Sequence, residues 1–228
     1  IGCEDGPAID PQYCVGMGYE VSLREAARLL RAVIRPAMDA ARRVGVHVCH
    51  VEPWHIARRH PEALEMAPEP QSARPLPAPV VPGWRERMLA RAHGPHFATC
   101  SPYARMDRAA IVAPLPGEIY AYDTAQFDGL LRQRGIENLI YTGFAADMCV
   151  LRAPGGIEPM LPYGYRIFLM RDATLGVEAP DVFEERLATR WAIRYFEAHF
   201  GDTVTFDDFV RACALLEHEK ACGDKNGV

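Results

Sequence analysis

The feature that most constrains this chain is the alternation of short apolar strands with amphipathic helices in its second half. Strands are predicted at 109–113, 119–122, 138–142 and 166–170. Helices are predicted at 124–134, from residue 146, at 180–200 and at 205–217. Because strand–helix–strand connections bury a parallel sheet on both faces, this order predicts an α/β protein, a three-layer α/β/α sandwich with a mostly parallel central sheet.

The first half begins with one long helix and a strand. Ser22 and Glu25 have the spacing of a capping box, which predicts that the helix starts at Ser22. Pro36 is expected to bend this helix, and Gly45 to end it in the left-handed conformation. The strand follows at 46–51.

We expect residues 1–228 to form a single domain. Seven prolines between Pro61 and Pro82 predict an extended surface excursion over 61–83, suited to clasping another subunit. A helix is predicted directly after it, at 84–92.

Composition excludes several classes of protein. The formal charge of -5 argues against a nucleic-acid partner. No run approaches the roughly 18 apolar residues of a membrane helix, so no membrane partner is expected. Seven scattered cysteines without a C-x-x-C pair predict reduced thiols in the cytoplasm. Nucleotide-binding glycine motifs are absent too, so no cofactor is predicted.

Cys149 is the sharpest candidate for chemistry. The chain runs from an apolar strand through Gly143 into an expected helix start, where the positive end of the helix dipole favours a thiolate. Unpaired backbone amides at such a turn can also stabilise an oxyanion. The alternative is a buried cysteine that packs under the sheet.

The segment around this cysteine resembles a known family. Thr142-Gly-Phe-Ala-Ala-Asp-Met-Cys149-Val is similar to the T-G-x-x-T-D-x-C-V turn of the isochorismatase-like cysteine hydrolases. The helix at 127–136 is similar to the family's L-x-x-x-L-R-x-x-G-I segment. Gly164-Tyr165 and the later Asp172-Ala-Thr174 resemble its G-Y-x-V-x-x-x-x-D-A-T segment. The resemblance covers about 22–51 and 106–200.

The resemblance implies a three-layer fold and hydrolysis of a small-molecule amide or related C–N bond through a thioester on Cys149. It implies a non-proline cis peptide between Phe144 and Ala145. The oxyanion donors would be the amides of Cys149 and of Ala145 or Ala146. Relatives form dimers or tetramers, so a homo-oligomer is expected.

The family also uses an Asp–Lys–Cys triad, and here the chain departs from it. The region where the family lysine is expected, 114–118, contains Glu118 as its one ionisable group. The only lysines are Lys220 and Lys225, and no strand ending in the family Asp is visible before residue 22. The chain therefore resembles a divergent member that lacks the family lysine.

Further departures lie in the nucleophile turn. Ala146 replaces the family threonine, and Pro154-Gly155-Gly156 interrupts the helix that carries Cys149. Three explanations stay open: Glu118 acts as the base of a rebuilt triad; the first strand and its Asp are absent from this sequence, which begins with Ile1; or the chemistry is lost and a thiol pocket remains.

Aromatic residues are expected to line a small substrate pocket, with Trp54, His55 and Tyr120 as its walls. Family amidases that hydrolyse nicotinamide carry a D-W-H metal motif where this chain has Pro53-Trp54-His55. His50, His93 and His96 could supply further nitrogen donors, but proline replaces the aspartate and no spacing is diagnostic, so no metal is predicted. The stripe at Phe183, Leu187, Trp191 and Tyr195 is expected to be core, in the helix over 180–200 whose N-cap is expected to be Asp181.

Three functions follow. The first is a hydrolase with Cys149 as its nucleophile. The second is a catalytically silent relative that binds a small molecule or forms an oligomer. The third is a thiol-redox sensor built on Cys149, which requires a second thiol nearby.

Overall fold

The computed structural model describes residues 20–61, 81–93 and 107–223. Most of the excursion predicted at 61–83, and the segment before the first helix, therefore lie outside the described residues. The strands are β1 (Cys49–Val51), β2 (Ile119–Ala121), β3 (Asn138–Phe144), β4 (Arg166–Leu175) and β5 (Asp202–Val204). The helices are α1 (Glu20–Leu29), α2 (Arg35–Val44), α3 (Trp54–Ala57), α5 (Trp84–His93), α7 (Thr124–Gln133), α8 (Cys149–Arg152), α9 (Ile157–Met160), α10 (Leu187–His199) and α11 (Phe206–Gly223).

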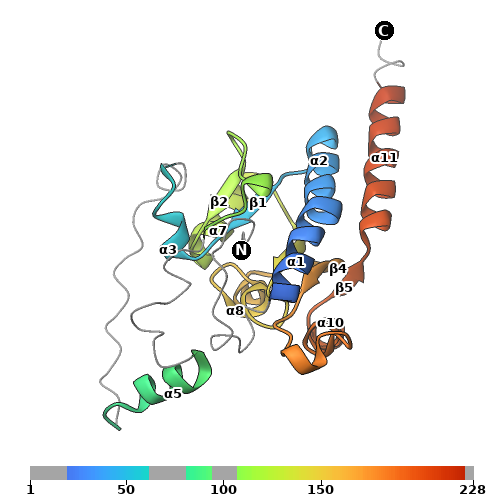
Figure 1. The fold of residues 1–228 in the computed structure, drawn as a ribbon. Coiled ribbons are helices and arrows are strands. Elements are labelled where there is room, and N and C mark those ends of the chain that lie inside the picture. Colours follow the sequence, from blue (N-terminus) through green and yellow to red (C-terminus); the bar gives the residue numbers. More distant parts are fainter. Residues whose placement is uncertain (1–19, 62–80, 94–106, 224–228) are drawn as a thin grey trace.

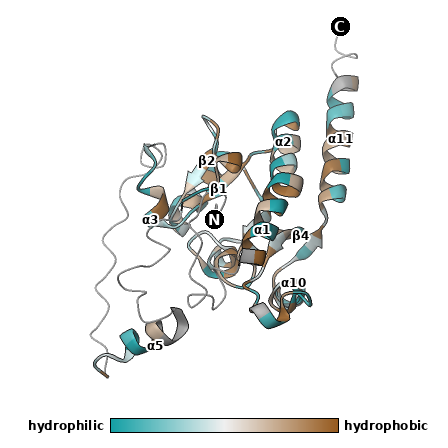
Figure 2. Cartoon of the chain, viewed as in Figure 1, coloured by the Kyte–Doolittle hydropathy of each residue, from teal (hydrophilic) through white to brown (hydrophobic). Residues whose placement is uncertain are grey.

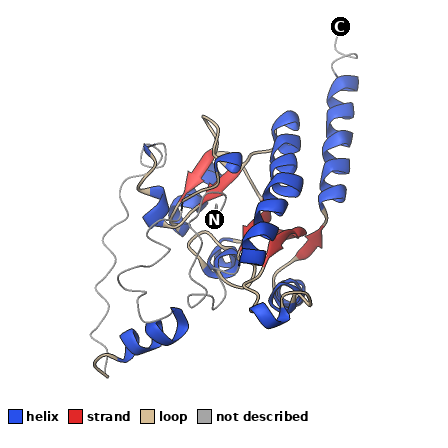
Figure 3. Cartoon of the chain, viewed as in Figure 1, coloured by secondary structure: helices blue, strands red, loops and turns tan. Residues whose placement is uncertain are grey.

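Every strand pair in the described residues is parallel, which confirms the α/β class. β1 pairs with β2, aligning His50 with Tyr120, and β4 pairs with both β3 and β5. The hydrogen bonds of the described residues thus form two ladders, of two and three strands, rather than one continuous sheet. Figure 3 shows the strands in the middle of the molecule with helices packed around them.

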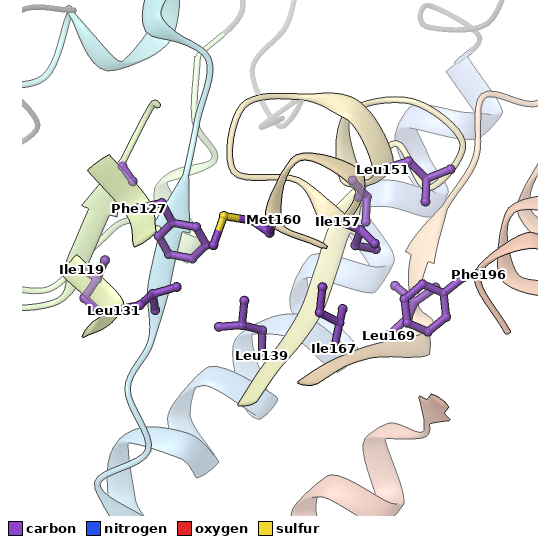
Figure 4. Packing of buried hydrophobic residues seen from close by; sticks show 12 residues of the cluster. Ile119, Phe127, Leu131, Leu139, Leu151, Ile157, Met160, Ile167, Leu169 and Phe196 are labelled. Carbon is purple, nitrogen blue, oxygen red and sulfur yellow. The ribbon is translucent and has the colours of Figure 1, made fainter. Parts of the chain in front are cut away.

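Helix α7 connects the two ladders along the chain. Its Phe127 and Leu131 pack in one buried cluster with Ile119 at the start of β2 and Leu139 near the start of β3. Figure 4 shows Ile119 and Leu131 at the left of this cluster, Leu139 below its middle, and Leu151, which follows β3, at its upper right. The side chains of α7 thus join the two ladders in one core.

The first helix starts earlier than predicted and contains an irregular turn. α1 already includes Ser22, whose hydroxyl is buried, so the expected capping box at Ser22 is wrong. A π-helical turn, Leu30–Ile34, precedes Pro36, and the Arg35 amide donates to the Leu30 carbonyl. Proline has no N–H to continue the regular ladder, which explains why the distortion lies here. Gly45 ends α2 with φ 73°, as predicted.

The strand predicted at 109–113 is also wrong. Ala110–Val112 forms a 3₁₀ turn, and Ile111 and Val112 pack against Leu30 and Ile34 of the first helix. The Arg35 guanidinium donates to the Ile111 carbonyl over 2.8 Å, which holds the turn against the helix. A short apolar run is buried equally well in a strand or in a turn, so hydrophobicity alone did not separate them.

The helix predicted over 180–200 is divided. A 3₁₀ turn covers Pro180–Val182, and α10 begins only at Leu187, after Arg186 in the left-handed region at φ 52°. The apolar stripe predicted from Phe183 to Tyr195 is therefore only partly in the core: Leu187 is 49% exposed and Trp191 is 51% exposed. Trp191 instead stacks on Tyr195, with ring centroids 5.0 Å apart.

The last helix, α11, packs on α2. Cys213 of α11 is buried against Ala40 and Val44 of α2, and Lys220 Nζ donates to the Val44 carbonyl over 2.6 Å. Figure 1 shows the two helices side by side, and Figure 2 shows that both carry hydrophilic and hydrophobic residues in turn. Lys220 thus donates to a carbonyl at the end of α2, where cations are favourable.

We expect Asp123→Ala to destabilise the protein by about 1 kcal/mol, the usual value of a helix N-cap. Asp123 accepts hydrogen bonds from the amides of Ala125 and Gln126 at the start of α7. The matched control is Asp181→Ala, because Asp181 was the predicted cap of the 180–200 helix but caps nothing in the described structure. Urea unfolding should show a loss of stability in Asp123→Ala and none in Asp181→Ala. Equal losses of unfolding free energy in the two variants would contradict the assignment of Asp123 as the cap of α7.

Candidate active site at the end of β3

The turn that carries Cys149 begins inside β3. Gly143 adopts φ 103°, and the peptide bond between Phe144 and Ala145 is cis, where the resemblance placed it. The Thr174 hydroxyl donates to the Gly143 carbonyl over 2.7 Å. Phe144 packs with Leu175 against the first helix, so its ring braces the turn against the body of the fold.

Cys149 is a free, half-buried thiol at the first position of α8. The helix was expected to begin near Ala146, but it starts at Cys149 and has only four residues. It stops because Ala153 is extended before Pro154, which cannot continue a helix. One helical turn carries little of a full macrodipole, so the expected dipole activation is weak here.

Two of the three predicted oxyanion donors remain available. The Ala146 amide donates to the Leu175 carbonyl over 2.9 Å, so it is committed to the protein and the prediction for Ala146 needs correction. In the described part of the chain, the amides of Ala145 and Cys149 donate to no protein acceptor. Oxyanion stabilisation needs such uncommitted N–H groups beside the reacting atom.

Glu118 lies elsewhere. Its carboxylate accepts from Arg42 at 2.7 Å and 3.1 Å, from His50 at 2.8 Å and from the Leu115 amide at 2.8 Å. Burial alone would raise the pKa of Glu118, but hydrogen bonds from Arg42, Leu115 and His50 outweigh it and lower the pKa to about 2.

The position of Glu118 also separates it from Cys149. Glu118 directly precedes β2, at the amino end, whereas Cys149 follows the carboxyl end of β3. The described hydrogen bonds of Glu118 reach Arg42, His50 and the Leu115 amide, and none reaches Cys149. The structure does not bring them together, and the base role predicted for Glu118 has no supporting contact.

His50 completes the network around Glu118. Burial is the main cause that lowers the pKa of His50, although the Glu118 carboxylate opposes it. A neutral imidazole facing a carboxylate must carry its proton on the facing nitrogen, so His50 Nε2–H donates to Glu118. Nε2 of His50, a possible metal donor in the sequence, is therefore already engaged.

The predicted pocket residues are only partly together. Trp54 and the fully buried Tyr120 belong to one cluster with Tyr122, whose ring centroid lies 4.7 Å from that of Trp54. His55 is exposed, and its pKa is lowered by partial burial and then by Arg59 and Arg58. The structure thus places Trp54 and Tyr120 in one packed cluster and leaves the exposed His55 outside it.

The sequence did not predict two charged residues that contact Tyr120 of this cluster. The Tyr120 hydroxyl donates to the Glu52 carboxylate, and Arg108 donates to the same hydroxyl over 3.2 Å. The Arg108 guanidinium lies 4.9 Å above the Tyr120 ring and 3.4 Å from Glu52. A charged residue directly after an apolar strand was the available signal, because it places Glu52 at the carboxyl end of β1.

Neither a metal cluster nor a membrane-crossing helix is found over residues 20–61, 81–93 and 107–223. There, no three His, Cys, Asp or Glu side chains come together as ligands. His96, a further possible donor in the sequence, lies outside these ranges. Within the same ranges no helix combines the length and the apolar character that crossing a bilayer requires.

Comparison with solved structures defines the class of fold. The chain is similar to a cysteine hydrolase from Pseudomonas syringae, with a TM-score of 0.56 and 17% identity over 92% of this chain and 96% of the other. It is also similar to an isochorismatase family protein from Desulfovibrio vulgaris, with a TM-score of 0.51 and 20% identity over 90% and 95%. The chain has the isochorismatase-like fold, and the resemblance seen in the sequence is confirmed at that level.

A relative of assigned function agrees with this class. The chain is 33% identical over 125 residues to the ureidoacrylate amidohydrolase RutB of Azorhizobium caulinodans. The match covers 50% of this chain and 48% of the relative, so the chain spans about half the length of the curated relative it matches. No protein-family model matches the chain.

Proposed function

We propose that this protein is a cysteine hydrolase that cleaves a small-molecule amide or a related C–N bond, with Cys149 as nucleophile. The observation that carries the proposal is the half-buried free thiol beside the uncommitted amides of Ala145 and Cys149. The similarity to a ureidoacrylate amidohydrolase supports a small amide or ureido compound as the substrate.

The reaction has two balanced steps. The Cys149 sulfur attacks the carbonyl carbon and forms a C–S bond, while the C–N bond breaks and the amine leaves with the thiol proton. Water then attacks the thioester, releasing the carboxylic acid and restoring the thiol. The amides of Ala145 and Cys149 would donate to the carbonyl oxygen as it becomes negative in each step.

Selective alkylation tests the reactivity of Cys149. Treated with iodoacetamide near neutral pH, Cys149 should label about tenfold faster than Cys213, as followed by mass spectrometry. Burial raises the pKa of the Cys49 thiol to about 12 and also raises that of Cys213, so both should react slowly. The exposed Cys222, whose sulfur lies 3.7 Å from His218 Nδ1, is an internal reference for an accessible thiol; a Cys149 rate no higher than that of Cys222 would argue against activation.

One observation favours the silent alternative. In the described part of the chain, no acid or base side chain makes a hydrogen bond with the Cys149 sulfur. A protein that keeps the fold and binds a small molecule without cleaving it would look the same. Turnover of ureidoacrylate or another small amide eliminates this alternative, provided that the turnover depends on Cys149.

Assembly and location stay predictions. The exposed Leu187 and Trp191 on α10 support a homo-oligomer, since large apolar side chains on one helix face are typical of interfaces. Light scattering on the purified chain measures this directly. The four described cysteines are all free, which supports a reducing compartment such as the cytoplasm.

A further inference from the structure

Glu178 is a fully buried carboxylate that no step of the proposed reaction uses. Its oxygens accept hydrogen bonds from the Ala188 amide at 2.9 Å, the Thr189 amide at 2.8 Å and the Thr189 hydroxyl at 2.7 Å. These amides belong to the first turn of α10, where backbone N–H groups have no partner within the helix. Glu178 therefore caps α10 from the preceding loop.

The same loop is fixed to α10 at a second point. The Gly176 amide donates to the Thr189 hydroxyl over 2.8 Å. A Cβ on Gly176 would lie 2.7 Å from the Thr189 backbone nitrogen, so the loop and the helix are in direct backbone contact. Residues 176–178 are consequently held in one place by the start of α10.

On its other side, this loop contacts the turn that carries Cys149. The Val177 amide donates to the Asp147 carboxylate over 2.9 Å, and the Leu175 carbonyl accepts from the Ala146 amide over 2.9 Å. Arg152 of α8 also donates to the Asp147 carbonyl over 3.2 Å. Asp147 thus lies two residues before Cys149 and ties the turn both to the loop and to α8.

We propose that Asp147 and Glu178 are positioning residues for Cys149. Glu178 fixes residues 176–178 against α10. Asp147 accepts a hydrogen bond from Val177 in this segment, and so holds the nucleophile turn in a fixed position relative to it. This inference rests on the proposed function, because it assigns these carboxylates a role in aiming the Cys149 sulfur and the amides beside it. Small displacements of such groups reduce reaction rates strongly.

A pair of substitutions at Asp147 separates geometry from charge. Asp147→Asn retains a side-chain oxygen that can accept from the Val177 amide, so Cys149 in this variant should alkylate within about twofold of the wild-type rate. Asp147→Ala loses the hydrogen bond and should slow alkylation of Cys149 about tenfold relative to Cys222 in the same molecules. Equal slowing in both variants would show that charge matters instead of position, and no slowing in either would overturn the proposal.

Hydrogen exchange of the peptide covering 143–152 provides a readout that does not depend on thiol chemistry. Glu178→Gln removes the charge that caps α10, and we expect faster exchange both in α10 and in this peptide. The matched control is Asp208→Ala, which removes the exposed carboxylate that accepts from Thr205 at the start of α11. It should leave the 143–152 peptide unchanged.

The two readouts distinguish failure of this inference from failure of the proposed function. If the wild-type Cys149 is unreactive but Glu178→Gln still loosens 143–152, the coupling stands and the hydrolase proposal fails. If Cys149 is reactive and neither Glu178→Gln nor Asp147→Ala changes the exchange of 143–152, the positioning role is wrong.

Discussion

Cys149→Ala is expected to reduce turnover of a ureido or amide substrate by about 1,000-fold or more, because the substitution removes the sulfur on which the proposed thioester forms. The substitution removes one sulfur atom from a half-buried position, so the free energy of unfolding should change by less than about 1 kcal/mol. Product release, measured as ammonia or acid from ureidoacrylate and a panel of small amides, checks the first effect. Urea unfolding checks the second.

Cys222→Ala is the control for this experiment. Cys222 is an exposed thiol near the end of α11, so its removal should leave both turnover and stability as in the wild type. If Cys149→Ala retains wild-type turnover, the nucleophile is another group and the proposed mechanism is wrong. If neither protein turns over any substrate while Cys149 alkylates quickly, the silent alternative gains its strongest support.

The strands and helices that define the fold class could be predicted from sequence because their hydrophobic periods are clear. β3 and α7 fall where the alternating and helical patterns placed them, with Gly135 ending α7 in the left-handed region. The divided helix before α10 could not be predicted, since its signal is a tertiary one. Glu178 satisfies the amides of Ala188 and Thr189 and so selects the helix start, whereas the sequence offered Asp181 as a closer cap.

The candidate site was predicted in part. The strand, glycine and cysteine of the nucleophile turn are local in sequence, so motif spacing was enough to locate Cys149 and the cis peptide. The partners of Glu118 are not local: Arg42 lies 76 residues away and His50 lies 68 residues away. Sequence reasoning placed Glu118 by analogy with a catalytic position, but only the hydrogen bonds of the folded chain show that it faces these two residues.

Glu118→Gln should therefore act on stability and not on Cys149. We expect a loss of about 2 to 3 kcal/mol near pH 7, because Arg42 and His50 lose a carboxylate that is only 11% exposed. The Cys149 alkylation rate, normalised to Cys222, should stay within about twofold of wild type. A drop of about tenfold would instead restore the base role predicted for Glu118.

The pH dependence of the stability loss in Glu118→Gln identifies the cause of that loss. The pKa of Glu118 is lowered to about 2 in the folded protein from an ordinary value of 4.5, so its contribution is complete above pH 4.5 and disappears as the pH falls toward 2. The difference in unfolding free energy between wild type and Glu118→Gln should shrink across this window. Asp39→Asn is the matched control: it removes the other carboxylate that contacts Arg42, but one that is 40% exposed, and should cost less than about 1 kcal/mol. A larger loss in Asp39→Asn than in Glu118→Gln would show that burial does not decide the strength of this network.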